Sequence, residues 1–96
     1  MIDLPRGPWL HYKGGRYVLI FVAETHEHNG DLDVVYVSLT HGKAVTRPLT
    51  QDSRKQDSWD DVVEWPDRSR RQRFTLESEL SRFEIAELQR KWRGQT

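Results

Sequence analysis

The sequence contains no cysteine among its 96 residues. Without thiols, the chain cannot form disulfide bonds, use a thiolate nucleophile or hold zinc through sulfur ligands. It also lacks any apolar stretch near the roughly 20 residues that cross a membrane, and residues 1–10 lack the apolar segment of a secretion signal. We therefore expect a cytoplasmic protein with no membrane partner.

Apolar residues are also scarce, at 35% of the sequence, whereas charged residues make up 31%. A single domain of this size has a thin core, because small domains bury only about 60% of their unfolded surface. The formal net charge is zero, but residues 1–66 carry seven basic and ten acidic side chains, and residues 67–96 carry eight and five. The neutral total argues against general coating of nucleic acid, while the basic C-terminal third permits local contact with an anion.

Turn signals divide the first part of the chain into short strands. Gly14-Gly15 predicts a two-residue turn after a strand at Trp9–Tyr12, because glycine adopts positive φ without steric cost. Asn29-Gly30 and His41-Gly42 predict two more turns, and hence a four-stranded meander. The strand that follows the first turn is apolar on both faces, which predicts burial on both sides. The remaining predicted strands are 16–24, 32–40, 43–47, 59–65 and a last one that ends near residue 77.

The C-terminal segment predicts a helix at about 81–93. Ser81 and Glu84 have the spacing of a capping box, in which each side chain bonds the backbone N–H of the other residue. Leu80 and Ile85 occupy the positions of a hydrophobic staple. Short strands joined by tight turns, with one terminal helix, indicate a mainly β single domain. We expect a small SH3-like barrel, or a strongly curved antiparallel sheet, over about residues 8–77.

Four short segments have the order and spacing found in a known family. They are His11-Tyr12-Lys13-Gly14-Gly15 with Tyr17 two residues later, Val34-Val35-Tyr36, Arg47-Pro48-Leu49 and Arg73-Phe74. Together they resemble domain-of-unknown-function family 1653, a small bacterial and phage domain, over residues 8–76. The resemblance implies an SH3-like barrel and no particular activity. The chain departs from the family pattern at Lys43-Ala44-Val45, where the family usually has an aromatic residue, and in its C-terminal helix.

The polar residues within these segments form the main candidate site. Aromatic rings beside lysine and arginine suit a flat or anionic ligand, through stacking and charge-assisted hydrogen bonds. The principal hypothesis is therefore a non-catalytic binding module for a small anionic or nucleotide-like ligand, or for single-stranded nucleic acid. In the alternative, the tyrosines are core residues and the arginine pairs with a carboxylate such as Asp33. The candidate ligand-binding residues are His11, Tyr12, Lys13, Tyr36 and Arg47.

A weaker candidate is a metal site in the second turn. His26 and His28, with Asp31, Asp33 and His41 near them in sequence, could supply nitrogen and oxygen ligands. The alternative is a solvated hairpin tip. A metal-dependent hydrolase is accordingly the least favoured function. No phosphate-cradling glycine loop, nucleophile elbow or helix-borne metal-hydrolase motif is present, so we expect neither catalysis nor a resident cofactor.

Two further patterns concern partners. The basic run Arg68, Arg70, Arg71 and Arg73 could bind nucleic-acid phosphates, or could be neutralised by nearby carboxylates. On the predicted helix, Ile85, Leu88 and Trp92 share one apolar face. That face either covers the open end of the barrel or joins a second chain. The second functional hypothesis is therefore a protein-interaction adaptor, with a homodimer through the helix or contacts through the sheet edges.

Overall fold

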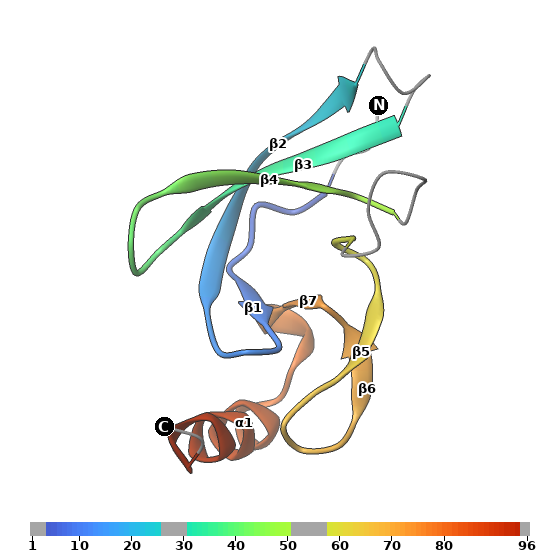
Figure 1. Ribbon diagram of the computed structural model, residues 1–96. Helices are drawn as coiled ribbons and strands as arrows, with labels where there is room; N and C mark the ends of the chain where they lie inside the picture. The colour runs from blue at the N-terminus through green and yellow to red at the C-terminus, as the bar shows by residue number, and fades with distance from the viewer. Residues whose placement is uncertain (1–3, 26–30, 51–57, 95–96) are drawn as a thin grey trace.

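The structure is a computed structural model that describes residues 4–25, 31–50 and 58–94. Two antiparallel sheets and one C-terminal helix make it mainly β, as predicted (Figure 1). The five-stranded sheet contains β1 (Trp9–His11), β2 (Arg16–Thr25), β3 (Asp31–Ser38), β4 (Ala44–Pro48) and β7 (Phe74–Leu76). The two-stranded sheet contains β5 (Val62–Glu64) and β6 (Arg70–Gln72). A 3-10 turn, η2 (Glu77–Glu79), leads to α1 (Arg82–Gly94).

The larger sheet has the strand order β4-β3-β2-β1-β7. The first four strands are neighbours in chain order, which confirms the predicted meander. Within the described residues β4 and β7 each have one strand partner, so the sheet is open and curved rather than closed into a barrel (Figure 1). The helical segments among the residues described do not reach the length and apolarity needed to cross a membrane.

The prediction that β2 is buried on both faces is wrong. Leu19 is 3% exposed, but Ile20 and Phe21 are 38% and 53% exposed. The cause is a β-bulge: Leu19 pairs with Tyr36, whereas Phe21 pairs with Val35, so Ile20 is an extra residue in the ladder. The bulge places Phe21 on the outer face of the sheet. From this point on, the side chains of β2 no longer alternate between the two faces as the sequence predicted.

The first turn is longer than predicted. β1 ends at His11 rather than Tyr12, so four residues join β1 to β2. The His11 N–H donates to the Gly15 carbonyl at 2.9 Å, and the Gly14 N–H donates to the His11 carbonyl at 2.8 Å. Gly14 has φ +106°, a conformation that L side chains rarely adopt. The second predicted turn, at Asn29-Gly30, lies outside the described residues.

Residues 58–76 form three short strands where the sequence predicted two longer ones. Trp59 lies in a turn, because its N–H donates to the Pro48 carbonyl at 2.8 Å instead of entering a ladder. Strand pairing changes at Arg73: β6 before it pairs with β5, and β7 after it pairs with β1. The Arg73 N–H donates to the Asp61 carbonyl at 2.6 Å and fixes this crossover between sheets.

An aromatic cluster fills the space between the sheet and the 58–61 turn. The rings of Trp59 and Phe74 are stacked, with centroids 3.9 Å apart and an interplanar angle of 4°. Tyr36 meets both rings edge-on, and Tyr17 meets Tyr36 and Phe74. The buried members of this core are Trp9, Leu19, Val34, Tyr36, Leu49, Trp59 and Phe74.

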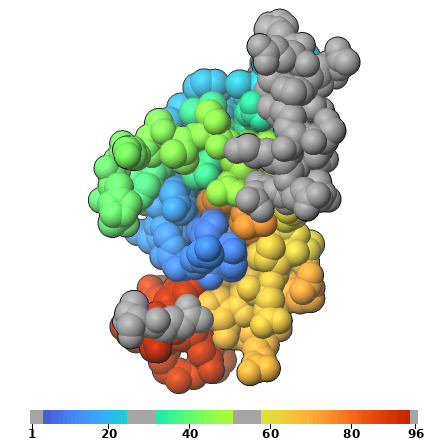
Figure 2. All heavy atoms as spheres, in the orientation of Figure 1, coloured from blue at the N-terminus to red at the C-terminus, as the bar shows by residue number. Residues whose placement is uncertain are grey.

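The capping box of α1 is confirmed. The Glu84 N–H donates to the Ser81 hydroxyl and the Ser81 N–H donates to the Glu84 carboxylate, both at 3.0 Å. One face of the helix packs against the end of the sheets, where Leu88 has no exposed surface and contacts the Leu10 and Trp65 cluster. Figure 2 shows the helix, in red, at the opposite end of the molecule from β4, in green.

The structure places the apolar face of Ile85, Leu88 and Trp92 against the rest of this chain, and a homodimer through the helix stays a prediction. All three pack within the second core cluster, and the Trp92 indole N–H donates to the Tyr12 carbonyl at 2.8 Å. The helix therefore covers one end of the sheet, which was the alternative left open by the sequence. Phe83, on another face of α1, is 80% exposed.

The aromatic stack should dominate stability. We expect Phe74→Ala to lower the free energy of unfolding by about 3–5 kcal/mol, because it deletes a fully buried ring and leaves a cavity. The matched variant Phe83→Ala should change it by less than about 0.5 kcal/mol, since that ring is solvated. Urea unfolding followed by circular dichroism measures both. Similar losses in the two variants would contradict this view of the core.

The first turn should tolerate no side chain at Gly14. A Cβ there would lie 3.2 Å from the Trp92 ring and would require a φ of +106°. We expect Gly14→Ala to destabilise the protein by about 1–3 kcal/mol. Gly94→Ala is the matched control, because a Cβ at that position meets no atom within 4 Å. Equal unfolding midpoints in urea for the two variants would show that the turn and helix are not in this contact.

Candidate ligand-binding pocket

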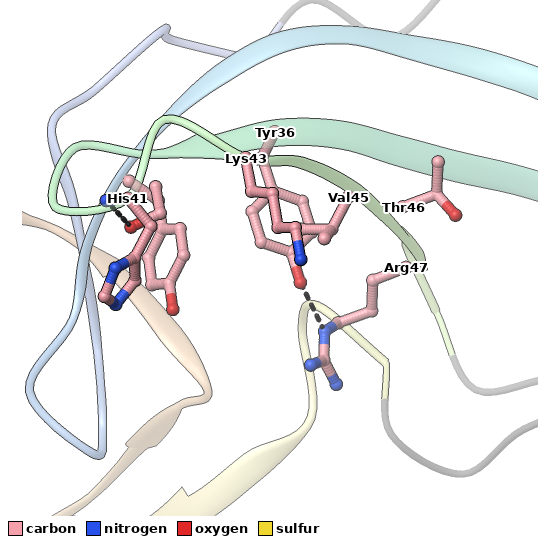
Figure 3. Close-up of a pocket in the computed structure, with 8 residues that line it drawn as sticks. Tyr36, His41, Lys43, Val45, Thr46 and Arg47 are labelled. Atoms are coloured by element: carbon pink, nitrogen blue, oxygen red, sulfur yellow. Dashed lines mark hydrogen bonds between the residues drawn. The ribbon is translucent and has the colours of Figure 1, made fainter.

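A pocket of about 670 Å³ lies on the inner face of β2, β3 and β4 (Figure 3). Its volume falls within the range of roughly 300–1,000 Å³ typical of small-molecule sites. The lining combines hydroxyl-bearing, basic and small apolar side chains. The residues are Tyr17, Tyr36, Ser38, His41, Lys43, Val45, Thr46 and Arg47.

The register of the meander brings these side chains together. Tyr17 pairs with Ser38, Tyr36 pairs with Val45, and Arg47 pairs with the buried Val34. Residues directly opposite one another in an antiparallel ladder share a face, as do residues two apart on one strand. The strands therefore place two tyrosines and Arg47 on the concave side, next to the aromatic core.

The β3–β4 turn closes one end of the pocket. The Ser38 hydroxyl accepts the N–H groups of Thr40 and His41, both at 3.1 Å. Gly42 provides the left-handed residue of the turn, with φ +68°. These bonds hold His41 beside the mouth of the pocket, where Figure 3 shows its ring across from Lys43.

Arg47 is positioned by its aromatic neighbours. Its Nε donates to the Tyr36 hydroxyl at 3.2 Å, and its guanidinium carbon lies 5.6 Å from the centre of the Phe74 ring. Because the Tyr36 oxygen accepts this bond, the hydroxyl can direct its own hydrogen to a further acceptor. Arg47 and Tyr36 thus present donors to an anion from one corner of the pocket.

The pocket is electropositive in composition. Its lining includes the cations Lys43 and Arg47 together with His41, and among the residues that the structure describes no aspartate or glutamate belongs to it. Lys43 is exposed and forms no ion pair with any residue that the structure describes. Such a set of donors without a carboxylate suits a carboxylate or phosphate group.

The five predicted ligand-binding residues do not form one site. Tyr36 and Arg47 line the pocket, whereas Tyr12 and Lys13 line a separate hollow of about 490 Å³ beside Trp65. The four-residue turn after β1 carries Tyr12 and Lys13 toward α1, where the Tyr12 carbonyl accepts the Trp92 indole N–H. A tertiary contact with the helix therefore separates residues that are close in the sequence pattern.

His11 lies between the two hollows, within the aromatic core. Its ring centroid is 4.7 Å from that of Tyr12 and 4.8 Å from that of Phe74. Burial lowers the pKa of His11 from 6.5 to about 4, with further lowering by the charges of Arg47, Arg73 and Lys13. The imidazole is therefore neutral at pH 7 and acts as a packing residue behind the pocket.

The aromatic part of the prediction also changes. Tyr36 is buried, and its ring is in edge contact with Tyr17, Trp59 and Phe74. It therefore offers its hydroxyl and no stacking surface. Tyr17 contributes a half-buried ring. Burial raises the pKa of its hydroxyl group, and the neighbouring Tyr36 raises that pKa further. Sequence reasoning assigned Tyr17 to the core and missed its place in the pocket, although its pairing with Ser38 follows from the hairpin register.

Sequence reasoning also missed Lys43 and His41 as pocket residues. His41 lies in the predicted His41-Gly42 turn and Lys43 follows it, and this turn was the only sequence signal that could have placed them beside Tyr36. The arginine run does not form one basic face. Arg71 pairs with Asp67 at 3.3 Å and with Glu84 at 3.0 Å, which is the intramolecular neutralisation left open above.

The other three arginines of the run differ in their contacts and exposure. Arg73 contacts the Asp61 carboxylate at 3.5 Å and donates to the Ser58 carbonyl at 3.0 Å. Arg68 and Arg70 are exposed. Two of the four side chains thus hold the 58–84 region together, and a phosphate-binding role for the whole run loses support.

The proposed metal ligands His26 and His28 lie outside the described residues. Within the part of the chain that the structure describes, no three histidine, aspartate or glutamate side chains gather as a metal site would require. His41, which the sequence linked to that site, lines the pocket instead. The metal hypothesis therefore stays a prediction that depends on the second turn.

Comparison with known proteins identifies no relative. No protein-family model, no curated protein and no solved structure matches the chain. The resemblance to domain-of-unknown-function family 1653 stays a prediction from the sequence. The case for a function accordingly rests on the chemistry of the pocket.

The His11 environment gives a pH dependence of stability. Between pH 4 and 6.5 the unfolded chain binds more protons at this residue than the folded protein, whose His11 pKa is about 4. The stabilisation is complete above pH 6.5 and is lost as the pH falls to about 4. We expect the melting temperature of wild type to fall more steeply over this range than that of His11→Gln. Parallel melting curves would contradict a neutral, buried His11, and an imidazole proton titration by NMR measures the pKa directly.

Proposed function

We propose that the protein is a non-catalytic binding module that takes a small anionic ligand in the β2–β3–β4 pocket. The observation that carries this proposal is the lining itself, which among the described residues has two cations, four hydroxyl groups and no carboxylate. Hydrogen bonds from charged donors to a carboxylate or phosphate are roughly twice as strong as neutral ones. The concave shape and volume support a ligand of small-molecule size.

The anionic group, rather than a base, is the feature most strongly supported. The buried Tyr36 ring presents no face to a ligand, so base stacking has at most the half-buried Tyr17 ring and the exposed His41 ring. Single-stranded nucleic acid usually needs a series of exposed aromatic rings along a basic groove. A mononucleotide would therefore be held through its phosphate, near Lys43 and Arg47.

The alternative function, a protein-interaction adaptor, draws no support from the helix. Its apolar face is occupied by Leu10 and Trp65. The edge of the larger sheet at β4 lies beside the pocket, and a role for it is a separate question. No arrangement of described side chains suggests a nucleophile with its base, so binding without catalysis is the simpler proposal.

Lys43 provides the cleanest test, because it is exposed and its loss should leave the core intact. We expect inorganic phosphate, adenosine monophosphate or glutarate to shift the amide NMR signals of Ser38, Lys43 and Arg47. Lys43→Ala should weaken this binding about 10- to 100-fold, the range for a lost charged hydrogen bond of roughly 1.5–3 kcal/mol. Its melting temperature should match that of wild type.

Lys13→Ala is the matched control for this experiment. Lys13 is also exposed, but it lines the other hollow with Tyr12, Glu64 and Arg68. We expect this variant to bind the three anions as wild type does. Binding that depends on Lys13 rather than Lys43, or the absence of binding by all three anions, would overturn the proposed function.

A further inference from the structure

β4 is an edge strand whose outer backbone groups can be assigned. The Ser38 N–H donates to the Lys43 carbonyl at 3.2 Å, and the Leu49 N–H donates to the Leu32 carbonyl at 2.8 Å. In an antiparallel ladder such bonds recur at every second residue. The N–H and C=O groups of Ala44 and Thr46 therefore point away from β3, and no strand among the described residues pairs with them.

This edge has defined ends. At one end the β3–β4 turn begins to curve at Lys43. At the other, Pro48 has no N–H, and its carbonyl already accepts the Trp59 N–H at 2.8 Å. The open edge is therefore short and matches an extended segment of three to five residues. Neither a proline nor a bulge interrupts it, and Val45 in its middle is 39% exposed.

The edge and the pocket share side chains. Lys43, just before β4, and Val45 and Arg47 within it lie at alternate positions on the pocket face, with Val45 opposite Tyr36 (Figure 3). A residue of an added strand that lay opposite Val45 would project its side chain onto the same face. Lys43 and Arg47 would then be its two diagonal neighbours, within reach of a long side chain. A carboxylate at that position would meet a cation on either side.

We propose that β4 binds an acidic peptide in an extended conformation, which adds a strand to the sheet. The peptide places one glutamate or aspartate over the pocket, between Lys43 and Arg47. This rests on the proposed function, because the side-chain carboxylate is then the anion that the pocket takes. The backbone bonds to Ala44 and Thr46 supply affinity, and the pocket supplies the preference for an acid.

Charge complementarity favours this partner over a second copy of the chain. Two β4 strands paired antiparallel about Val45 would set Lys43 of one copy opposite Arg47 of the other. Like charges directly opposite one another destabilise a pair of strands. A carboxylate on a peptide residue opposite Val45 is instead attracted by both cations.

The test uses the full chain and the synthetic peptide acetyl-Thr-Val-Glu-Val-Thr-amide, labelled for fluorescence polarisation. We expect it to bind at least tenfold more tightly than the same peptide with glutamine in place of glutamate. N-methylation of its two valines, which removes the N–H donors on the edge side, should weaken binding by at least tenfold. Slowed hydrogen exchange at the Ala44 and Thr46 amides should accompany binding.

Ala44→Pro separates the edge from the pocket, because Ala44 is not among the described lining residues. It removes one outward N–H and leaves the bonds to β3 in place. We expect this variant to lose the peptide yet still bind inorganic phosphate. If N-methylated and unmodified peptides bind alike while phosphate still depends on Lys43, edge addition is wrong and the anion pocket stands. If neither phosphate nor peptide binds, both proposals fail.

Other partners are distinguished in the same assay. A ten-nucleotide oligothymidine that binds more tightly than the glutamate peptide would overturn the peptide proposal. So would equal binding of the glutamine peptide, which would remove the role of the carboxylate. Dimerisation of wild type that Ala44→Pro abolishes, seen by analytical ultracentrifugation, would assign the edge to a second copy instead.

Discussion

The parallel stack of Trp59 on Phe74 is the contact on which the rest of the structure depends. It joins the turn that follows β4 to β7, two segments that have no strand pairing with each other. Tyr36 packs against both rings from β3, and Arg47 lies over Phe74 from β4. A thin core of this kind depends on a few large rings, because aromatic side chains bury the most area per residue.

The pocket depends on this stack, because the stack positions one of the cations that line it. Arg47 is held by the Phe74 ring and the Tyr36 hydroxyl, so its donors are fixed only when the core is assembled. Lys43, by contrast, owes its place to the β3–β4 turn alone. The site thus combines one cation fixed by the core with one exposed cation on a flexible stem, which suits ligands of differing size.

Local patterns in the sequence were sufficient for the meander, the capping box and the mainly β class. They failed where a non-local contact decides the outcome. Phe21 faces outward because a bulge at Ile20 shifts the ladder, and no residue there signals one. Tyr12 and Lys13 lie outside the pocket because their turn contacts the helix, where the Tyr12 carbonyl accepts the Trp92 indole N–H. Tyr36 and Arg47 were proposed from the family-like segments, and they meet in the structure because they lie on adjacent strands of one hairpin.

The pairing of β1 with β7 sets the order in which the chain can be assembled. β1, at residues 9–11, pairs with β7, at residues 74–76, so the two strands are far apart in the sequence. A nascent chain on the ribosome can form the meander early, but its inner rings have no Phe74 to pack against until that segment emerges. Such long-range closure is slow compared with hairpin formation. In a partly synthesised chain, the rings of Tyr17 and Tyr36 therefore lack the packing partner that orders them in the finished fold.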